Sequence, residues 1–360
     1  MTARRWFAAL GSATTLLLAT ATLCLTSGCG TLGYYAQSVG GHLALVNAAR
    51  PVPQWLADET TTPALRERLA LSQRMRDFAV AALHLPDNAS YRRFADLHRP
   101  AAVWNVVAAP ALSLTLKTWC FPVVGCVGYR GYFDRAEADA FAAEQRGEGL
   151  ETSVYPVPAY STLGALPGDW LADPLLSTFI LYPEGELARL VFHELAHQVV
   201  YVAGDTMFNE SFATAVERIG GQRWLDEHAT PQARAEYAVF EGRRQDFRAL
   251  TRGYRARLLA LYESDADPAA QRAGKAELLA SLRADHAAIK QERWGGFAGY
   301  DGWFARANNA AFGVLAAYNE LVPGFERLFD AEGRDFPRFY AAVKRLAALP
   351  KEQRRAALAP

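Results

Sequence analysis

The sequence of 360 residues has no excess of charge of either sign, because Lys and Arg together number 38 and so do Asp and Glu. A chain without net charge offers no electrostatic basis for nucleic acid as its main partner. Internal repeats, a phosphate-binding glycine loop and low-complexity tracts beyond the N-terminal segment are missing too. What is present, 51% apolar residues, indicates an ordered globular protein of one or two domains.

Cysteine is scarce, with four in the chain. Cys24 and Cys29 belong to an N-terminal segment with the features of a signal, which leaves Cys120 and Cys126. These two flank a turn-rich loop, and in an oxidising compartment we expect them to form a disulfide, with buried free thiols as the alternative. A metal site built on this pair would need further Cys or His nearby, and the sequence supplies none there.

The N-terminus is typical of a secretory signal, since Arg4 and Arg5 precede an uncharged stretch up to Gly28. This stretch ends in Leu25-Thr26-Ser27-Gly28-Cys29, which resembles a bacterial lipobox with Thr26 where Leu is usual. The resemblance implies that residues 1–28 are cleaved and that Cys29 carries a lipid anchor, with the folded part in the periplasm of the cell envelope. Gly30 in place of a retention-type Asp favours the outer membrane. An uncleaved transmembrane anchor and simple secretion are the alternatives.

Hydrophobic periodicity predicts an α+β protein that is mainly helical. Helices are expected at residues 34–49, 62–83, 91–97, 134–145, 186–202, 233–263, 269–292, 305–321 and 336–346, and strands at 101–108, 112–119, 127–133 and 152–157. We expect one unit, residues 29–360, made of N-terminal helices and a small mixed sheet (29–180), a pair of helices (181–221) on which the sheet packs, and a helical C-terminal part (222–360). The last part contains a long helical hairpin, and residues 351–360 are expected to be a solvated tail.

The residues that carry chemistry lie on the helix expected at 186–202, in the motif His193-Glu194-Leu195-Ala196-His197. Histidines four apart project from one helix face and can bind one metal ion. Glu194 follows the first of them and lies where it can deprotonate a water. This spacing predicts a site for one Zn²⁺ ion with Glu194 as the general base.

A catalytic zinc site needs a third protein ligand, and a second helix beginning near Asn209 supplies one. Folded back as an antiparallel pair, this helix brings Glu210 opposite the two histidines. Glu217, two turns further on, is either an alternative ligand or a carboxylate that orients a histidine.

The two segments HELAHQ and NESFATAVE resemble the active-site helices of gluzincin metallopeptidases, particularly the membrane alanyl aminopeptidases. In those enzymes the glutamate after Asn is the third zinc ligand, which implies that role for Glu210. The chain is also similar, over most of its mature length, to a family of predicted aminopeptidases among bacterial envelope lipoproteins. Two departures from the alanyl enzymes stand out: His197 and Glu210 are closer in sequence, and the segment that binds the substrate amine is missing.

A peptidase of this kind also needs a hydrogen-bond donor for the developing oxyanion and an edge strand along which the substrate lies. The strand candidates are residues 127–133 and 160–162. The residues considered as donors or substrate contacts are Tyr129, Tyr132, Tyr160, Tyr300, Tyr318 and Asn309. Asn308 and Asn309, expected in the middle of a helix, either contact substrate or bridge helices.

These features predict a zinc peptidase that acts on peptides, with aminopeptidase action implied by the family resemblance. An endopeptidase is one alternative. The other is a non-catalytic envelope-assembly lipoprotein with structural zinc, for which the helical hairpin would be the docking surface. The sequence indicates no oligomeric state.

Overall fold

The computed structural model describes residues 28–121, 125–162 and 168–359. The predicted signal, residues 1–28, thus lies outside them except for its last residue, and the side chains of Cys29 and Tyr318 are likewise not described. The chain divides into two units, Met1–Leu45 and Val46–Pro360. The first holds most of helix α2 (Gly28–Ala48). Among the described residues, no helix is both long and apolar enough to span a membrane.

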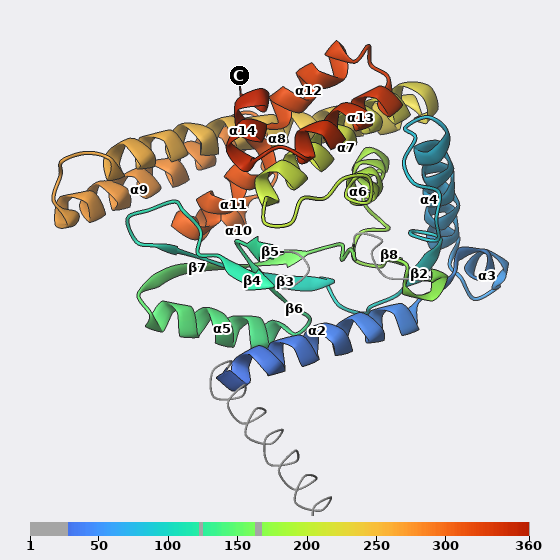
Figure 1. Cartoon of the computed structure of the whole chain (residues 1–360), viewed down its shortest axis with the longest axis horizontal. Coiled ribbons are helices and arrows are strands. Elements are labelled where there is room, and N and C mark those ends of the chain that lie inside the picture. Colours follow the sequence, from blue (N-terminus) through green and yellow to red (C-terminus); the bar gives the residue numbers. More distant parts are fainter. Residues whose placement is uncertain (1–27, 122–124, 163–167, 360) are drawn as a thin grey trace, which may run out of the picture. The chain divides into compact units, whose positions relative to one another are not determined.

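The second unit is mainly helical with small sheets, so the predicted α+β class is confirmed (Figure 1). Its helices before residue 184 are α3 (Val52–Ala57), α4 (Pro63–Ala81), α5 (Arg135–Gly147) and the 3-10 turn η1 (Asp169–Leu171). The helices that follow are α6 (Glu184–Ala196), α7 (Thr206–His228), α8 (Pro231–Tyr262), α9 (Pro268–Glu292), α10 (Asp301–Ala305), α11 (Asn309–Asn319), α12 (Val322–Ala331), α13 (Phe336–Ala347) and α14 (Lys351–Leu358).

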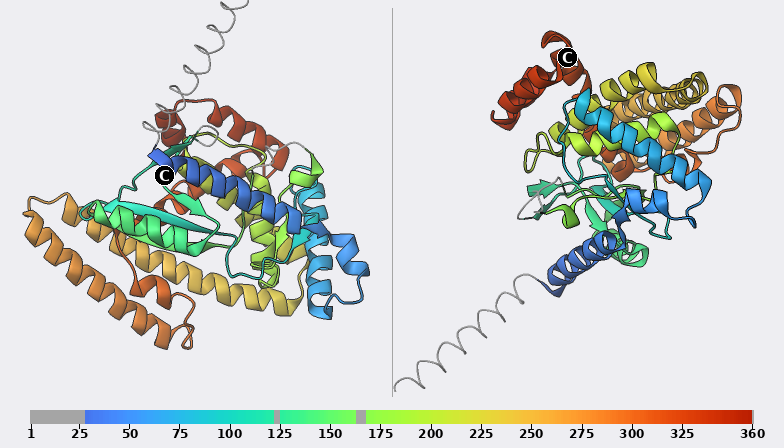
Figure 2. Two further views of the ribbon diagram at one scale, coloured as in Figure 1. Left: turned by 90° about the horizontal axis from the view of Figure 1, so that it is seen from below. Right: turned by 90° about the vertical axis from the view of Figure 1, so that its right-hand side faces the viewer.

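Helix starts coincide with capping residues that the sequence displays. The side chains of Thr62, Asp134, Thr230, Asp267 and Asp335 each accept a hydrogen bond from a backbone N–H in the first turn of α4, α5, α8, α9 and α13. Such caps satisfy donors that a helix leaves unpaired at its start. The predicted hairpin is present as α8 and α9, which lie side by side (Figure 2).

The central sheet has three antiparallel strands in the order β6 (Arg130–Tyr132), β3 (Val103–Pro110), β7 (Leu150–Val157). Consecutive residues of β3, from Asn105 to Ala109, are buried, so both faces of the strand must be covered. Helix α5 covers one face and α11 the other, and α11 also contacts α7 (Figure 1). The sheet is thereby connected to the helix pair.

Two smaller sheets complete the strands. One is mixed and runs β1 (Arg50–Pro51), β2 (Arg93–Ala95), β8 (Leu175–Leu176), and the other is the hairpin of β4 (Trp119–Phe121) and β5 (Gly125–Val127). The helix expected at residues 91–97 is therefore wrong: Tyr91 has a positive φ of 63° and the segment pairs with two other strands. Residues 113–118, expected as a strand, have no regular structure, and the strand expected at 127–133 is split between β5 and β6.

Two of the expected helices also differ in extent. Helix α6 stops at Ala196 rather than at residue 202. The helix expected at 305–321 is broken into α10 and α11, so the two asparagines stand at a helix start and not in its interior. There Asn308 accepts a hydrogen bond from the N–H of Ala311, as an N-cap does.

The C-terminal segment is helix α14 and not a solvated tail. Its Arg354 donates to Asp205 at 3.1 Å from Nε and 2.9 Å from Nη2. Asp205 is the N-cap of α7, and the two side chains are 8% and 2% exposed. A buried ion pair thus fastens the end of the chain to the start of the helix that carries Glu210.

We predict that Arg354→Met lowers the free energy of unfolding by about 3–5 kcal/mol, because it leaves the Asp205 carboxylate buried without its cation. Urea unfolding followed by circular dichroism measures this change. The matched control is Arg355→Met on the exposed side of α14, where we expect a change within about 0.5 kcal/mol. Similar losses for both variants would contradict a special role for the ion pair.

Candidate metal centre

The helices α6 and α7 bring His193, His197 and Glu210 together. The Nε2 atoms of the two histidines are 3.2 Å apart. Glu210 Oε2 lies 3.3 Å from Nε2 of His193 and 3.7 Å from Nε2 of His197. Two imidazole nitrogens and a carboxylate oxygen thus face a common point, as the antiparallel pair predicts.

The spacing of these atoms fits a small tetrahedral cation. Ligands about 2.0–2.1 Å from a tetrahedral zinc ion lie about 3.3–3.4 Å from one another. The three observed separations, 3.2, 3.3 and 3.7 Å, are close to that value. The donor set of two imidazoles and one carboxylate is also one that catalytic zinc sites use. The three residues can therefore hold a metal ion.

The loop between the helices is closed by Asn209, which precedes Glu210. Its Oδ1 accepts from the N–H of Val202 at 2.8 Å, and its Nδ2 donates to the C=O of Val202 at 2.8 Å. The side chain is 1% exposed. Both backbone groups of Val202 are bonded to Asn209, so Val202 cannot belong to α6, which ends at Ala196 with His197 at its C-cap. The helix is thus shorter than its apolar pattern predicts.

Glu217 lies on the other side of the His193 ring. Its Oε2 is 3.0 Å from Nδ1 of His193, and its Oε1 accepts a hydrogen bond from Arg189. A carboxylate on Nδ1 holds the proton there and leaves the Nε2 lone pair directed at the cluster. Of its two predicted roles, the placement of Glu217 matches that of a carboxylate that orients a histidine.

The charges of the cluster are strongly coupled. Burial opposes a charge on His193, but the hydrogen bonds and negative charges of Glu210 and Glu217 outweigh it and raise the pKa of His193 well above its usual value. Burial also acts against the Glu210 carboxylate, yet the two histidines hold the pKa of Glu210 at about 2. Without metal, the proton on His193 is thus stabilised by the two carboxylates, and a cation bound at Nε2 would replace it.

Glu194 has the opposite shift. Burial, together with the charges of Glu210 and Glu217, raises the pKa of Glu194 above its usual value, although the two histidines lower it. A carboxylate with a raised pKa accepts a proton more readily at neutral pH. The side chain next to the metal ligands is thus suited to general-base chemistry.

Two buried groups near Glu194 were not anticipated. Burial raises the pKa of Tyr91 well above its usual value, and the charges of Glu194 and Asp173 add to this effect. Burial also raises the pKa of Asp173 to about 6, against the hydrogen bonds from Thr162 and Ser161. Residues 91–97 were expected to form a helix, so the approach of Tyr91 to Glu194 could not be inferred from the local sequence.

Two tyrosines whose pKa values are affected by the charge of Glu210 are also ones that the sequence did not single out. Burial raises the pKa of Tyr155 on β7 to about 12, and the charge of Glu210 contributes. Glu210 also contributes to the raised pKa of Tyr201, whose ring lies 6.4 Å from that of His197. Asn105 donates to the Tyr155 hydroxyl at 3.4 Å across the sheet. The position of Tyr201, four residues after His197, was the one signal available in the sequence.

Four of the tyrosines named from the sequence make the following packing contacts. Tyr132 packs against Phe141 and Tyr160 against Phe133, while Tyr129 contacts the cluster of Val107, Ala109 and Ala310. Tyr300 stacks on Phe247, with ring centroids 4.5 Å apart.

Asn309 accepts from the Tyr262 hydroxyl and donates to the carbonyls of Pro110 and Ala111, so it bridges helices and sheet. Its two predicted roles were substrate contact and helix bridging, and these bonds match the second.

The two strand candidates for substrate differ in structure. Strand β6, within residues 127–133, is at the edge of the central sheet among the described residues. Residues 160–162 form no strand, and Ser161 and Thr162 instead donate to the carboxylate of Asp173. Cys120 and Cys126 face each other across the β4–β5 hairpin and are joined by a disulfide bond.

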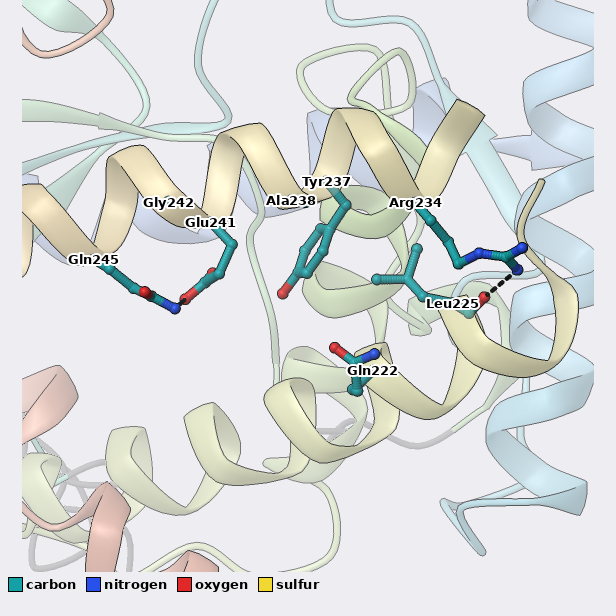
Figure 3. Close-up of a pocket in the computed structure, with 8 residues that line it drawn as sticks. All are labelled: Gln222, Leu225, Arg234, Tyr237, Ala238, Glu241, Gly242 and Gln245. Carbon is teal, nitrogen blue, oxygen red and sulfur yellow. Dashed lines mark hydrogen bonds between the residues drawn. The ribbon is translucent and has the colours of Figure 1, made fainter. Parts of the chain in front are cut away.

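A pocket of 330 Å³ lies between α7 and α8 (Figure 3). It is lined by Gln222, Leu225, Arg234, Tyr237, Ala238, Glu241, Gly242 and Gln245. Tyr237 and Glu241 also accept hydrogen bonds from Arg189. The pocket therefore lies next to Arg189, whose partner Glu217 contacts His193.

Comparison with known proteins gives one match. No curated protein and no solved structure matches the chain. A family model described as "Putative aminopeptidase" matches residues 33–358, which include the whole of α6 and α7. The chain therefore belongs to this putative aminopeptidase family.

Proposed function

We propose that the protein is a zinc-dependent aminopeptidase of the bacterial cell envelope. The observation that carries this proposal is the convergence of His193, His197 and Glu210, with Glu194 beside them. Three protein ligands favour catalysis over a structural role, because structural zinc sites fill all four positions with protein ligands. Family membership supports peptide as the substrate class.

Each residue of the site has a defined task in this proposal. His193, His197 and Glu210 bind the ion, which when present supplies a Lewis acid that polarises a peptide carbonyl and acidifies water. Glu194 accepts a proton from the attacking water and delivers it to the departing amine. Because its pKa is raised, the Glu194 carboxylate accepts a proton more readily at neutral pH, and its protonated form can then donate to the amine.

We predict opposite behaviour for two glutamine variants. Glu194→Gln keeps stoichiometric zinc but lowers kcat by about 10²–10⁴ or more, since it removes the base and not a ligand. Glu210→Gln weakens zinc binding by about 100-fold or more, because one of three ligands is lost. Elemental analysis and peptide hydrolysis measure the two quantities.

Glu137→Gln on the exposed side of α5 is the control for this pair, with both quantities expected to be unchanged. Full hydrolysis by Glu194→Gln would remove the mechanism. Absence of zinc from the wild-type protein would remove the catalytic proposal as a whole.

The aminopeptidase assignment is tested with matched peptides that have free or acetylated N-termini. We predict that the acetylated peptides are cleaved at least about 100-fold more slowly, because an exopeptidase site recognises the free amine. Mass spectrometry of the products identifies the bond that is cut. Equal cleavage of both peptides at internal bonds would identify an endopeptidase instead.

We propose that Cys29 carries the lipid that holds the protein in the envelope, on the basis of the lipobox-like residues 25–29. Cys29→Ser should then lose incorporation of labelled palmitate and move from the detergent phase to the aqueous phase on extraction. Cys24→Ser is the matched control and should keep the label. Label retained in Cys29→Ser would contradict the assignment.

A further inference from the structure

Arg189 is a buried cation one helical turn before His193. Its side chain is 5% exposed and lies among groups from α7 and α8. It donates to Glu217, to the Tyr237 hydroxyl at 3.1 Å and to Glu241 at 3.0 Å. A guanidinium removed from water needs such partners, because burial of an unpaired charge is costly.

Two glycines inside helices make room for this arrangement. A Cβ on Gly221 of α7 would lie 2.6 Å from Cγ of Arg189, and one on Gly185 of α6 would lie 2.4 Å from Cδ2 of Tyr237. Glycine within a helix costs about 1 kcal/mol relative to alanine. Neither contact leaves room for a Cβ, so the Arg189 stem and the Tyr237 ring are packed closely among α6, α7 and α8.

The two oxygens of Glu217 are divided between two partners. Oε1 accepts from Arg189, and Oε2 faces Nδ1 of His193. With one oxygen held by a planar guanidinium, the carboxylate cannot rotate freely, and the other oxygen fixes the tautomer and the ring orientation of His193.

His197 differs from His193 in the neighbours of its Nδ1. Over the part of the chain that the structure describes, neither Nδ1 makes a well-aligned hydrogen bond, but Nδ1 of His193 faces Oε2 of Glu217 at 3.0 Å, whereas no carboxylate lies within ion-pair distance of Nδ1 of His197. The contact with a carboxylate at Nδ1 is thus particular to His193.

The outer contacts hold Arg189 in turn. Glu241 accepts from Arg189 and also pairs with Arg244 and Arg248, at 3.2 and 3.5 Å. Arg244 pairs with Glu186 on α6. The ion pairs join three arginines, at 189, 244 and 248, with three glutamates, at 186, 217 and 241, so their charges balance. Removal of Arg189 therefore leaves Glu217, the glutamate that faces His193, without its cation.

We propose that Arg189 is a positioning residue that preorganises the metal ligand His193 through Glu217. The inference rests on the proposed metal site, but not on its peptidase chemistry. It predicts that the metal affinity of the protein depends on a side chain that does not itself reach the metal.

The test is the zinc affinity of the full-length protein, measured by competition with a chromogenic chelator. We expect Arg189→Met to weaken zinc binding by about 10–100-fold, the range found when a group that orients a metal ligand is lost. Arg189→Lys keeps the charge but cannot span Glu217 and the α8 groups together, so a loss of intermediate size is expected. The visible spectrum of the cobalt-substituted protein should change in the same order.

Arg244→Met is the matched control, because Arg244 is in the same network but does not touch Glu217. We expect its zinc affinity to stay within about threefold of the wild type, even if its unfolding midpoint falls as far as that of Arg189→Met. If Arg189→Met does not fold, Arg189→Lys carries the comparison with Arg244→Lys. A stabilising role alone would lower the unfolding midpoints and leave zinc affinity and the cobalt spectrum unchanged.

A double-mutant cycle tests the route through Glu217. In the Glu217→Gln background, Arg189→Met should add less than about threefold to the loss of zinc affinity, because both variants break the same connection. Independent losses, wild-type affinity in Arg189→Met, or an equal loss in Arg244→Met would each overturn the inference. A wild-type protein that binds zinc but cleaves no peptide would defeat the proposed function and leave this inference standing.

Discussion

The structure of the site depends on the position of His193 between two carboxylates of one helix. Glu210 faces its Nε2 and Glu217 its Nδ1, and the two glutamates are seven residues apart on α7. Seven residues are two helical turns, so both side chains lie on one face of α7 and reach the ring from opposite ends. This arrangement requires α6 and α7 to run close together and antiparallel.

The charged groups on the outer side of His193 are tolerated there because they form ion pairs with one another. The network of three arginines and three glutamates lies on the side of His193 away from the other ligands, and its charges balance. The candidate metal ligands are coupled differently: against the effect of burial, the carboxylates of Glu210 and Glu217 raise the pKa of His193, and the two histidines lower that of Glu210. The paired side provides rigidity, and the two imidazoles and the carboxylate provide donors suited to a cation.

The sequence predicted the features that local patterns encode. The HExxH spacing and the glutamate after Asn209 identified three residues that the fold brings within reach of one another. The expected starts of α4, α5, α8, α9 and α13, taken from hydrophobic periodicity, lie within two residues of the observed ones. These signals are contained in segments of a few residues, and so are independent of the rest of the fold.

The parts of the structure that the sequence did not predict depend on contacts between residues far apart in the chain. Residues 91–97 became part of a sheet because they pair with β1 and β8, which are distant in sequence. The C-terminal segment is helical, and its Arg354 pairs with Asp205, 149 positions earlier in the chain. Arg189 has the same origin: in sequence it is one charged residue on an amphipathic helix, and its partners become visible only when α7 and α8 are in place.

The short connection between α6 and α7 also depends on contacts that the local sequence does not show. Twelve residues separate His197 from Glu210, fewer than in the alanyl aminopeptidases that the motif resembles. The chain accommodates this because α6 ends at Ala196 and Asn209 bonds both backbone groups of Val202. Asn209 closes the loop while the next residue, Glu210, completes the cluster. The Asn-Glu pair therefore couples the turn to the candidate metal site, and the short turn still brings Glu210 to the two histidines.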